Sequence, residues 1–280
     1  MNQIFDLSRW WKLVTLHWVQ NRKRYLLAIP AIAGLLLAWY IFLFVIDRYS
    51  PIDPFSQYTS YYCGLYFAGC LYASMIFSEL GNQPQGIGYL SLPASHFEKL
   101  LCALLFSVVL FFTVFTIVFY LIDIPMVQFS NRLIEQEHRV YQDTGIPIGP
   151  VTVYNVFTGE GGPPTDRIYH ALLLAYFAIQ SAFILGSVYF TRYSFIKTTV
   201  AVLFIVFGYL LFEMKILNST LPAGWNIELF MGWRQDYGRG NVYYVNLPSW
   251  AATIVGFVFR FCLPFIFWLI TYFRLKEKEV

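Results

Sequence analysis

Charged residues are scarce in this chain. Asp, Glu, Lys and Arg make up 12% of its 280 residues, whereas hydrophobic residues make up 58%. Soluble domains average roughly 25% charged residues, so the composition excludes an ordinary soluble domain. Several uninterrupted apolar runs are each about 20 residues long, which matches the hydrocarbon thickness of a bilayer. Because apolar and polar residues do not alternate within these runs, the pattern also argues against a transmembrane β-barrel.

Residues for catalysis and metal binding are few as well. The chain has four histidines and four cysteines, and every cysteine lies inside an apolar run. It contains no H-E-x-x-H, no G-x-S-x-G and no G-x-x-x-x-G-K-[ST] phosphate-binding motif. We therefore expect no enzyme activity, no catalytic residues, no metal and no cofactor in this chain. A net charge of +3 gives no indication of a nucleic-acid partner.

The apolar runs predict an all-α, polytopic membrane protein with six transmembrane helices. A transmembrane domain of residues 25–280 follows an N-terminal segment of residues 1–24. The predicted spans are residues 25–46, 57–77, 100–122, 170–190, 198–212 and 251–273. The longer connections between these spans are residues 78–99, 123–169 and 213–249.

The N-terminal segment has the pattern of an amphipathic helix. Leu7, Trp11 and Val14 recur at helical spacing, while Arg9 and Lys12 fall elsewhere on the helical wheel. Tryptophans with basic neighbours are typical of a helix that lies flat in the membrane interface. The alternative is a soluble helix that packs on another part of the protein.

Basic residues in the short segments predict the orientation. Residues 22–24 read Arg-Lys-Arg before the first span, residues 192–197 form a basic turn, and the C-terminal tail is basic. Cytoplasmic segments close to spans carry an excess of Lys and Arg. We therefore expect both termini and the 78–99 loop in the cytoplasm, with 123–169 and 213–249 on the extracytoplasmic side.

The two extracytoplasmic loops differ in composition. Residues 123–169 are polar and end in a Gly/Pro-rich stretch, and a short helix at 126–142 fits their pattern. Residues 213–249 are aromatic, which favours short helices at the membrane interface. Arg260 and Glu213 are candidate intramembrane polar residues. Arg260 either meets a partner or a watery cavity inside the membrane, or snorkels to the outer surface.

The 78–99 loop has more structure than a simple connection requires. Ile87, Leu90 and Leu92 form the apolar face of a short amphipathic segment. Pro93 then ends that segment. Such a face indicates that something docks on the loop, whereas the alternative is a loop that only joins two helices.

The start of the third predicted span carries a helix-capping pattern. Ser95 can cap a helix that has Glu98 at its third position, which is the S-x-x-E capping box. The neighbouring His96 has no second ligand at metal spacing. We expect no nucleophile role for Ser95, because adjacent residues do not build a catalytic triad and capping explains the serine.

These features together resemble the permease subunits of ABC-type exporters of the second exporter class. Those permeases have an interfacial N-terminal helix, six spans and a structured cytoplasmic loop between the second and third spans. Their loop often carries a pattern similar to L-L-x-x-P-[VA]-S-x-x-E. The matching residues here are Tyr89, Leu90, Ser91, Leu92, Pro93, Ala94, Ser95, Glu98, Lys99 and Leu100.

The resemblance implies ATP-driven export across the bacterial cytoplasmic (inner) membrane. A separate cytoplasmic ATPase subunit would bind ATP and dock on the loop, and a second permease subunit would complete a homodimer or heterodimer in the lipid bilayer. The ATPase-coupling residues would be Ile87, Leu90, Leu92, Pro93, Ser95 and Glu98. Two alternatives stay open: a non-transporting scaffold that binds an extracytoplasmic partner through 123–169, and a secondary transporter.

Overall fold

The computed structural model describes most of the chain. The described residues are 5–46, 52, 54–81, 86, 88–89, 91–140, 151–161, 168–190, 192–212, 226–228, 231–236, 241–246, 250, 254 and 257–278. Among the predicted site residues, Ile87, Leu90 and Glu213 lie outside these ranges, and so does the side chain of Arg260.

Long apolar helices dominate the described residues, as the composition predicts. Five of them are long and apolar enough to cross a membrane, which indicates an integral membrane protein. These five run over Leu7–Ile46, Pro54–Leu80, His96–Leu133, Ala171–Tyr189 and Ser194–Leu211. The predicted sixth span, 251–273, includes residues that the structure does not describe; within it, the π-helical turn η4 (Val258–Cys262) leads into α10 (Leu263–Glu277).

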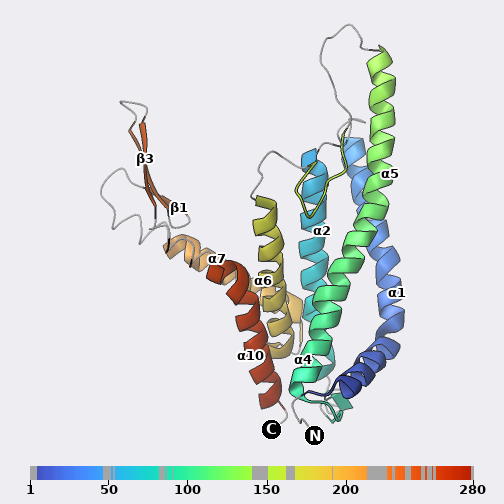
Figure 1. Ribbon diagram of the computed structural model, residues 1–280, viewed down its shortest axis with the longest axis vertical. Helices are drawn as coiled ribbons and strands as arrows, with labels where there is room; N and C mark the ends of the chain where they lie inside the picture. Colours follow the sequence, from blue (N-terminus) through green and yellow to red (C-terminus); the bar gives the residue numbers. More distant parts are fainter. Residues whose placement is uncertain are drawn as a thin grey trace.

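The first helix differs from the sequence prediction. Residues 1–24 and 25–46 were expected as two elements, but α1 runs without a break over Leu7–Ile46. In Figure 1 its first part lies at an angle to the rest, so the two predicted pieces form one bent helix. Pro30 stands inside α1, where it removes one backbone hydrogen bond without ending the helix.

The third helix is also longer than predicted. It begins as α4 (His96–Leu104), passes through the π-helical segment η2 (Leu105–Leu110) and continues as α5 (Phe111–Val140). The span predicted at 100–122 and the short helix predicted at 126–142 are therefore parts of one helix. Pro125 lies inside α5 and does not end it, so the loop predicted from residue 123 starts later.

A small antiparallel sheet is the exception to the helical fold. Its strands are β1 (Asn226–Glu228), β2 (Met231–Asp236) and β3 (Asn241–Asn246), in that order. The prediction of short helices in 213–249 is wrong for these residues, because they form strands. Figure 1 shows the sheet beyond the upper end of α7 (Ser194–Leu211), away from the other helices.

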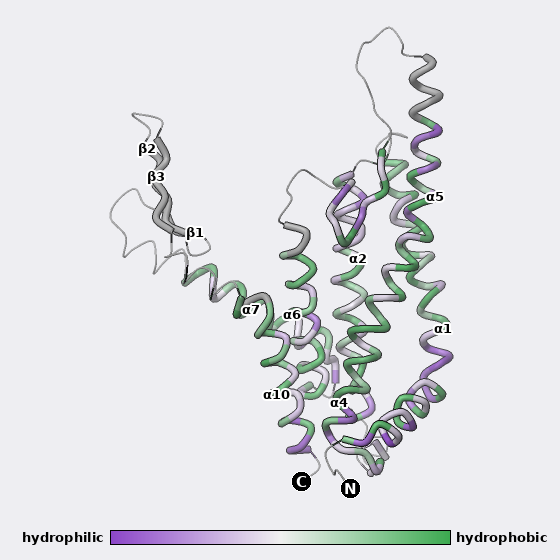
Figure 2. Tube along the Cα trace, viewed as in Figure 1, coloured by the Kyte–Doolittle hydropathy of each residue, from purple (hydrophilic) through white to green (hydrophobic). Residues whose placement is uncertain are grey.

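The start of α1 and the end of α10 lie at the same end of the helical bundle (Figure 1). We call it the terminal end. Figure 2 shows hydrophilic residues at this end, where α1 and α4 start and α10 stops. The ring of His96 in α4 lies 6.5 Å from that of Tyr272 in α10. The start of α4 and the C-terminal helix therefore meet at this end of the bundle.

Helix α2 (Pro54–Met75) packs closely against α6 (Ile168–Tyr189). A Cβ added at Gly69 would lie 2.5 Å from the hydroxyl oxygen of Tyr176. Only a residue without a side chain fits this contact. The second span therefore packs at Gly69 against a helix of the same chain.

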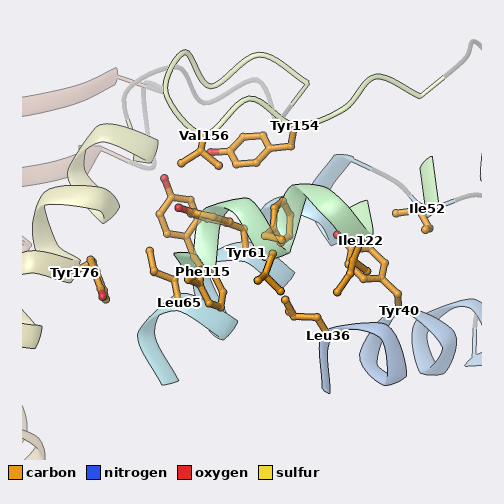
Figure 3. Close-up of a cluster of buried hydrophobic side chains, with 13 residues drawn as sticks. Leu36, Tyr40, Ile52, Tyr61, Leu65, Phe115, Ile122, Tyr154, Val156 and Tyr176 are labelled. Atoms are coloured by element: carbon orange, nitrogen blue, oxygen red, sulfur yellow. The ribbon is translucent and has the colours of Figure 1, made fainter. Parts of the chain in front are cut away.

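Aromatic side chains fill the core of the other half of the bundle (Figure 3). Tyr61 of α2 lies edge-on to Phe119 of α5, with ring centroids 4.9 Å apart. Its hydroxyl bonds to that of Thr116 at 3.0 Å, which satisfies both buried polar groups. The buried members of this cluster are Leu36, Tyr40, Ile52, Tyr61, Tyr62, Leu65, Phe115, Val118, Phe119, Ile122, Tyr154, Val156 and Tyr176.

Residues 151–161 fold back onto this core at the end opposite the terminal end. The carboxamide of Gln57 accepts from the Tyr154 N–H at 2.9 Å and donates to the Thr152 carbonyl at 3.2 Å. The carboxamide of Asn131 bonds in the same way to both backbone groups of Val151. Two amide side chains thus take the place of a neighbouring strand, which holds this part of the predicted 123–169 loop in place.

Candidate functional site

The predicted capping box at the start of α4 is confirmed. The Glu98 N–H donates to Ser95 Oγ at 3.2 Å, and the Ser95 N–H donates to Glu98 Oε2 at 2.9 Å. Each residue satisfies a backbone group that the first helical turn leaves without a partner. The assignment of Ser95 as a cap, rather than a nucleophile, agrees with this geometry.

The same carboxylate binds the beginning of α1. Arg9 Nε donates to Glu98 Oε2 at 2.8 Å and Arg9 Nη2 donates to Oε1 at 2.7 Å. The backbone N–H of Asp6 donates to Oε1 at 2.8 Å. With the Ser95 N–H, the carboxylate accepts four hydrogen bonds and its side chain has no solvent exposure. We call Asp6, Arg9, Ser95 and Glu98 the Glu98 junction.

The junction joins two helix N-termini. Asp6 caps α1, because its side chain accepts from the Ser8 N–H at 2.9 Å and its carbonyl accepts from Trp10. Glu98 therefore accepts the backbone N–H of the capping residue of both α1 and α4. The positive ends of both helix dipoles also favour a carboxylate at this position. Helix α1 and the start of α4 are consequently fixed to each other at the terminal end.

Leu92 contributes an apolar contact to the same connection. It packs with Ala94 against a buried cluster that joins α1 to α4 and η2, made of Leu13, Val14, Cys102 and Phe106. Leu92 is half-buried in this chain, whereas Ser91 and Pro93 are exposed. On the same segment, the Phe97 side chain is 39% exposed and its ring lies 6.2 Å from that of Phe5.

The end of α10 adds a further connection at the terminal end. The Lys278 ammonium donates to the Val188 carbonyl in the last turn of α6 at 2.6 Å. Burial, and then the nearby Arg274 charge, lower the pKa of Lys278. The Arg274 guanidinium lies 4.7 Å from the ring centroid of Tyr189. Helix α10 is thus attached to α6 through the Val188 carbonyl and the Tyr189 ring.

The structure identifies a buried polar pair that the sequence did not. The Tyr40 hydroxyl of α1 donates to Asp123 Oδ1 of α5 at 2.5 Å, and both residues have no solvent exposure. An acidic residue at the end of an apolar run was the available signal, but its partner lies 83 residues away in the sequence.

A second unexpected contact satisfies the π-helical segment η2. Gln180 of α6 is fully buried and donates from Nε2 to the Ser107 carbonyl at 2.6 Å. A π-helical turn disturbs the regular backbone hydrogen bonds, so a side-chain donor is favourable there. A glutamine within the apolar run of the fourth span was the only sequence signal.

Comparison of the chain with protein-family models, with curated proteins and with solved structures finds no match. Among the described residues, no group of three or more His, Cys, Asp or Glu side chains could hold a metal ion. The fold itself therefore defines the class: a helical integral membrane protein with a hydrogen-bonded junction at the end of the bundle where α1 and α4 begin.

Proposed function

We propose that this chain is the transmembrane permease subunit of an ATP-driven exporter. In this proposal the 78–99 loop is cytoplasmic and docks on a separate ATPase subunit, because the sequence holds no nucleotide-binding motif. The observation that carries the proposal is the Glu98 junction. A loop that only joined two helices would have no need of a buried carboxylate with four hydrogen bonds.

The junction supports a direct mechanical link from the loop to the transmembrane helices. Leu92 holds the loop against α1, and Glu98 holds the first turn of α4 against Arg9 and Asp6. A displacement of the loop would therefore move α1 and α4 together. The His96 ring also lies against the Tyr272 ring, so the same displacement would move α10. ATP-driven closure of two ATPase subunits could then open a path between two permeases.

The exposed residues of the loop offer the docking surface. Leu92 is engaged within the chain, so we assign it to the link between loop and α1. Pro93 and Phe97 present exposed apolar surface on the described part of the loop. Ile87 and Leu90, which complete the predicted coupling residues, lie outside the described residues. We expect the ATPase to contact Phe97 together with the Ile87–Leu90 face.

The second permease subunit would approach a helix that the described residues leave largely uncovered. Of the five candidate spans, α7 is the least buried, with 6% of its most apolar window inside the structure. Lipid alone can cover such a helix, but a partner subunit can as well. We therefore place the homodimer or heterodimer contact on α7 within this proposal.

Co-purification tests the proposed coupling. The tagged full-length chain, extracted in mild detergent, is expected to bring with it an ATPase that carries a Walker motif. Phe97→Asp should remove most of that ATPase, because it places a charge on the docking surface. Phe157→Asp is the matched control, since Phe157 is 60% exposed at the opposite end of the bundle. Absence of any ATPase, or equal recovery with both variants, would refute the coupling role.

A scaffold that binds an extracytoplasmic partner is the second candidate. The ordered fold of residues 151–161 favours it, since Gln57 and Asn131 hold that segment as a fixed surface. In this case Phe157→Asp, and not Phe97→Asp, would release the partner. The same pair of variants thus separates the two functions.

A further inference from the structure

A large groove opens between α1, α2 and the η2–α5 helix. Its volume is about 610 Å³, which is within the usual size of a small-molecule site. All three walls belong to helices that are long and apolar enough to cross a membrane. The groove therefore lies where lipid, rather than water, would reach it.

The polar residues of the groove gather at the terminal end. His17, Asn21 and Arg24 come from the first half of α1, and Ser78 and Glu79 come from the segment that follows α2. Away from the terminal end the groove is apolar, and its walls include Leu35, Gly64, Ala68 and Phe115. One end thus carries charges of both signs, and the remainder has the chemistry of a hydrocarbon chain.

The apolar part of the groove fits one leaflet of a bilayer. The α1 residues that line the groove run from His17 to Leu36, and the stretch from Arg24 to Leu36 is about 18 Å long at the rise of an α-helix. Half of the hydrocarbon core of a bilayer is about 15 Å. An acyl chain that starts at the level of Arg24 would therefore end near Leu35, at the middle of the bilayer.

We propose that this groove binds a phospholipid whose headgroup carries a phosphate and a primary ammonium, as in phosphatidylethanolamine. Arg24 is exposed, and among the described residues no side chain forms an ion pair with it. Its guanidinium binds the phosphate, and the Asn21 carboxamide lies on the same wall. Glu79 is half-buried at the same end and accepts from the ammonium.

Charge complementarity selects this headgroup over two common alternatives. A headgroup with phosphate alone, as in phosphatidylglycerol, satisfies Arg24 but leaves Glu79 without a cation. A trimethylammonium group, as in phosphatidylcholine, has no N–H to donate to Glu79. Basic pockets between helices on the cytoplasmic side of membranes are known to bind lipid headgroups, and the carboxylate adds the selectivity here.

Native mass spectrometry of the delipidated full-length chain in detergent tests this site. Dioleoyl phosphatidylethanolamine, phosphatidylcholine and phosphatidylglycerol are each titrated as the probe. We expect one phosphatidylethanolamine per chain, bound more tightly than the other two lipids. Arg24→Gln should weaken its affinity by about tenfold or more, the loss expected for one charge-assisted hydrogen bond. Arg22→Gln should leave it unchanged, because Arg22 belongs to the same basic cluster but does not line the groove.

Two further variants separate the headgroup from the acyl chain. Glu79→Gln should abolish the preference for phosphatidylethanolamine over phosphatidylglycerol while both lipids still bind. Ala68→Phe should fill the apolar wall and weaken the binding of all three lipids. Thermal unfolding in the same detergent confirms that each variant is folded.

Three results would overturn the inference. Equal affinity for phosphatidylethanolamine and phosphatidylglycerol in the unmodified chain would refute the headgroup assignment. Unchanged lipid binding in both Arg24→Gln and Ala68→Phe would refute the groove as the site. A dimer that forms without bound lipid and is lost in Ala68→Phe would assign the groove to a second copy of the chain. The inference is independent of the proposed transport function.

Discussion

Replacing Glu98 by glutamine tests the junction between α1 and α4 directly. The substitution keeps the size of the side chain but turns one carboxylate oxygen into an NH₂ group. Oε1 accepts from Asp6 N–H and Arg9 Nη2, whereas Oε2 accepts from Ser95 N–H and Arg9 Nε. Whichever oxygen is replaced, one backbone N–H and one Arg9 N–H lose their acceptor.

The expected cost follows from the buried backbone donor. A buried donor left without an acceptor costs about 1–3 kcal/mol. Arg9 adds little, because its side chain is 35% exposed and can be rehydrated by water. We therefore expect the free energy that holds α1 against α4 to fall by about 2 kcal/mol, which corresponds to a roughly 30-fold larger population of the separated state.

Labelling of Cys102 with a maleimide reports on that separation. Cys102 is 4% exposed in the cluster that contains Leu13 and Val14 of α1, so a reagent reaches it only when α1 moves away. Its labelling rate in detergent should rise about 30-fold in Glu98→Gln. Cys70 is the internal control, because it is buried in a different cluster that does not include α1. The other two cysteines are replaced by serine beforehand.

Two outcomes would refute this reasoning. If the labelling rate of Cys102 changes by less than about twofold, the junction does not hold α1 against α4. If Cys70 becomes reactive to the same extent as Cys102, the substitution has unfolded the bundle as a whole and the junction is not a local link.

Two further predictions concern packing elsewhere in the bundle. Gln57→Leu leaves the backbone groups of Thr152 and Tyr154 without their partner, at a cost of about 1–3 kcal/mol. Limited proteolysis within 151–161 should therefore become faster. An unchanged cleavage rate would contradict the role of Gln57. Gly69→Ala should lower the unfolding temperature by bringing a Cβ against Tyr176, at a cost of about 1–3 kcal/mol. Gly34→Ala is its control, since a Cβ there meets no atom within 4 Å, and equal melting of the two variants would contradict the close packing of α2 on α6.

Local patterns were read correctly from the sequence. The capping box needs only Ser95 and Glu98, three residues apart, so its two hydrogen bonds follow from the order of the residues. The helical, membrane-spanning character follows from composition alone. The contacts of Glu98 with Arg9 and Asp6 could not be predicted, because 89 and 92 residues separate the partners in the sequence.

Helix boundaries were the weaker part of the prediction, for physical reasons. The basic residues 22–24 suggested a break between an interfacial helix and a span, but polar residues are tolerated within one bent helix at the membrane surface. Asp123 and Pro125 suggested the end of the third span. Tyr40 donates to one oxygen of the Asp123 carboxylate inside the core, and α5 continues past Pro125. The aromatic residues of β2 and β3 favour strands as much as interfacial helices.

Photocross-linking from the position of Phe97 is the most direct test of the proposed coupling. A benzoylphenylalanine is introduced in place of Phe97, or in place of Phe157 as the control at the opposite end, and membranes from cells that express the chain are irradiated. The proposal predicts a covalent adduct between the Phe97 position and a cytoplasmic ATPase that carries a Walker motif, and none from the Phe157 position. An adduct with that ATPase from the Phe157 position, or no ATPase adduct from either position, would contradict it.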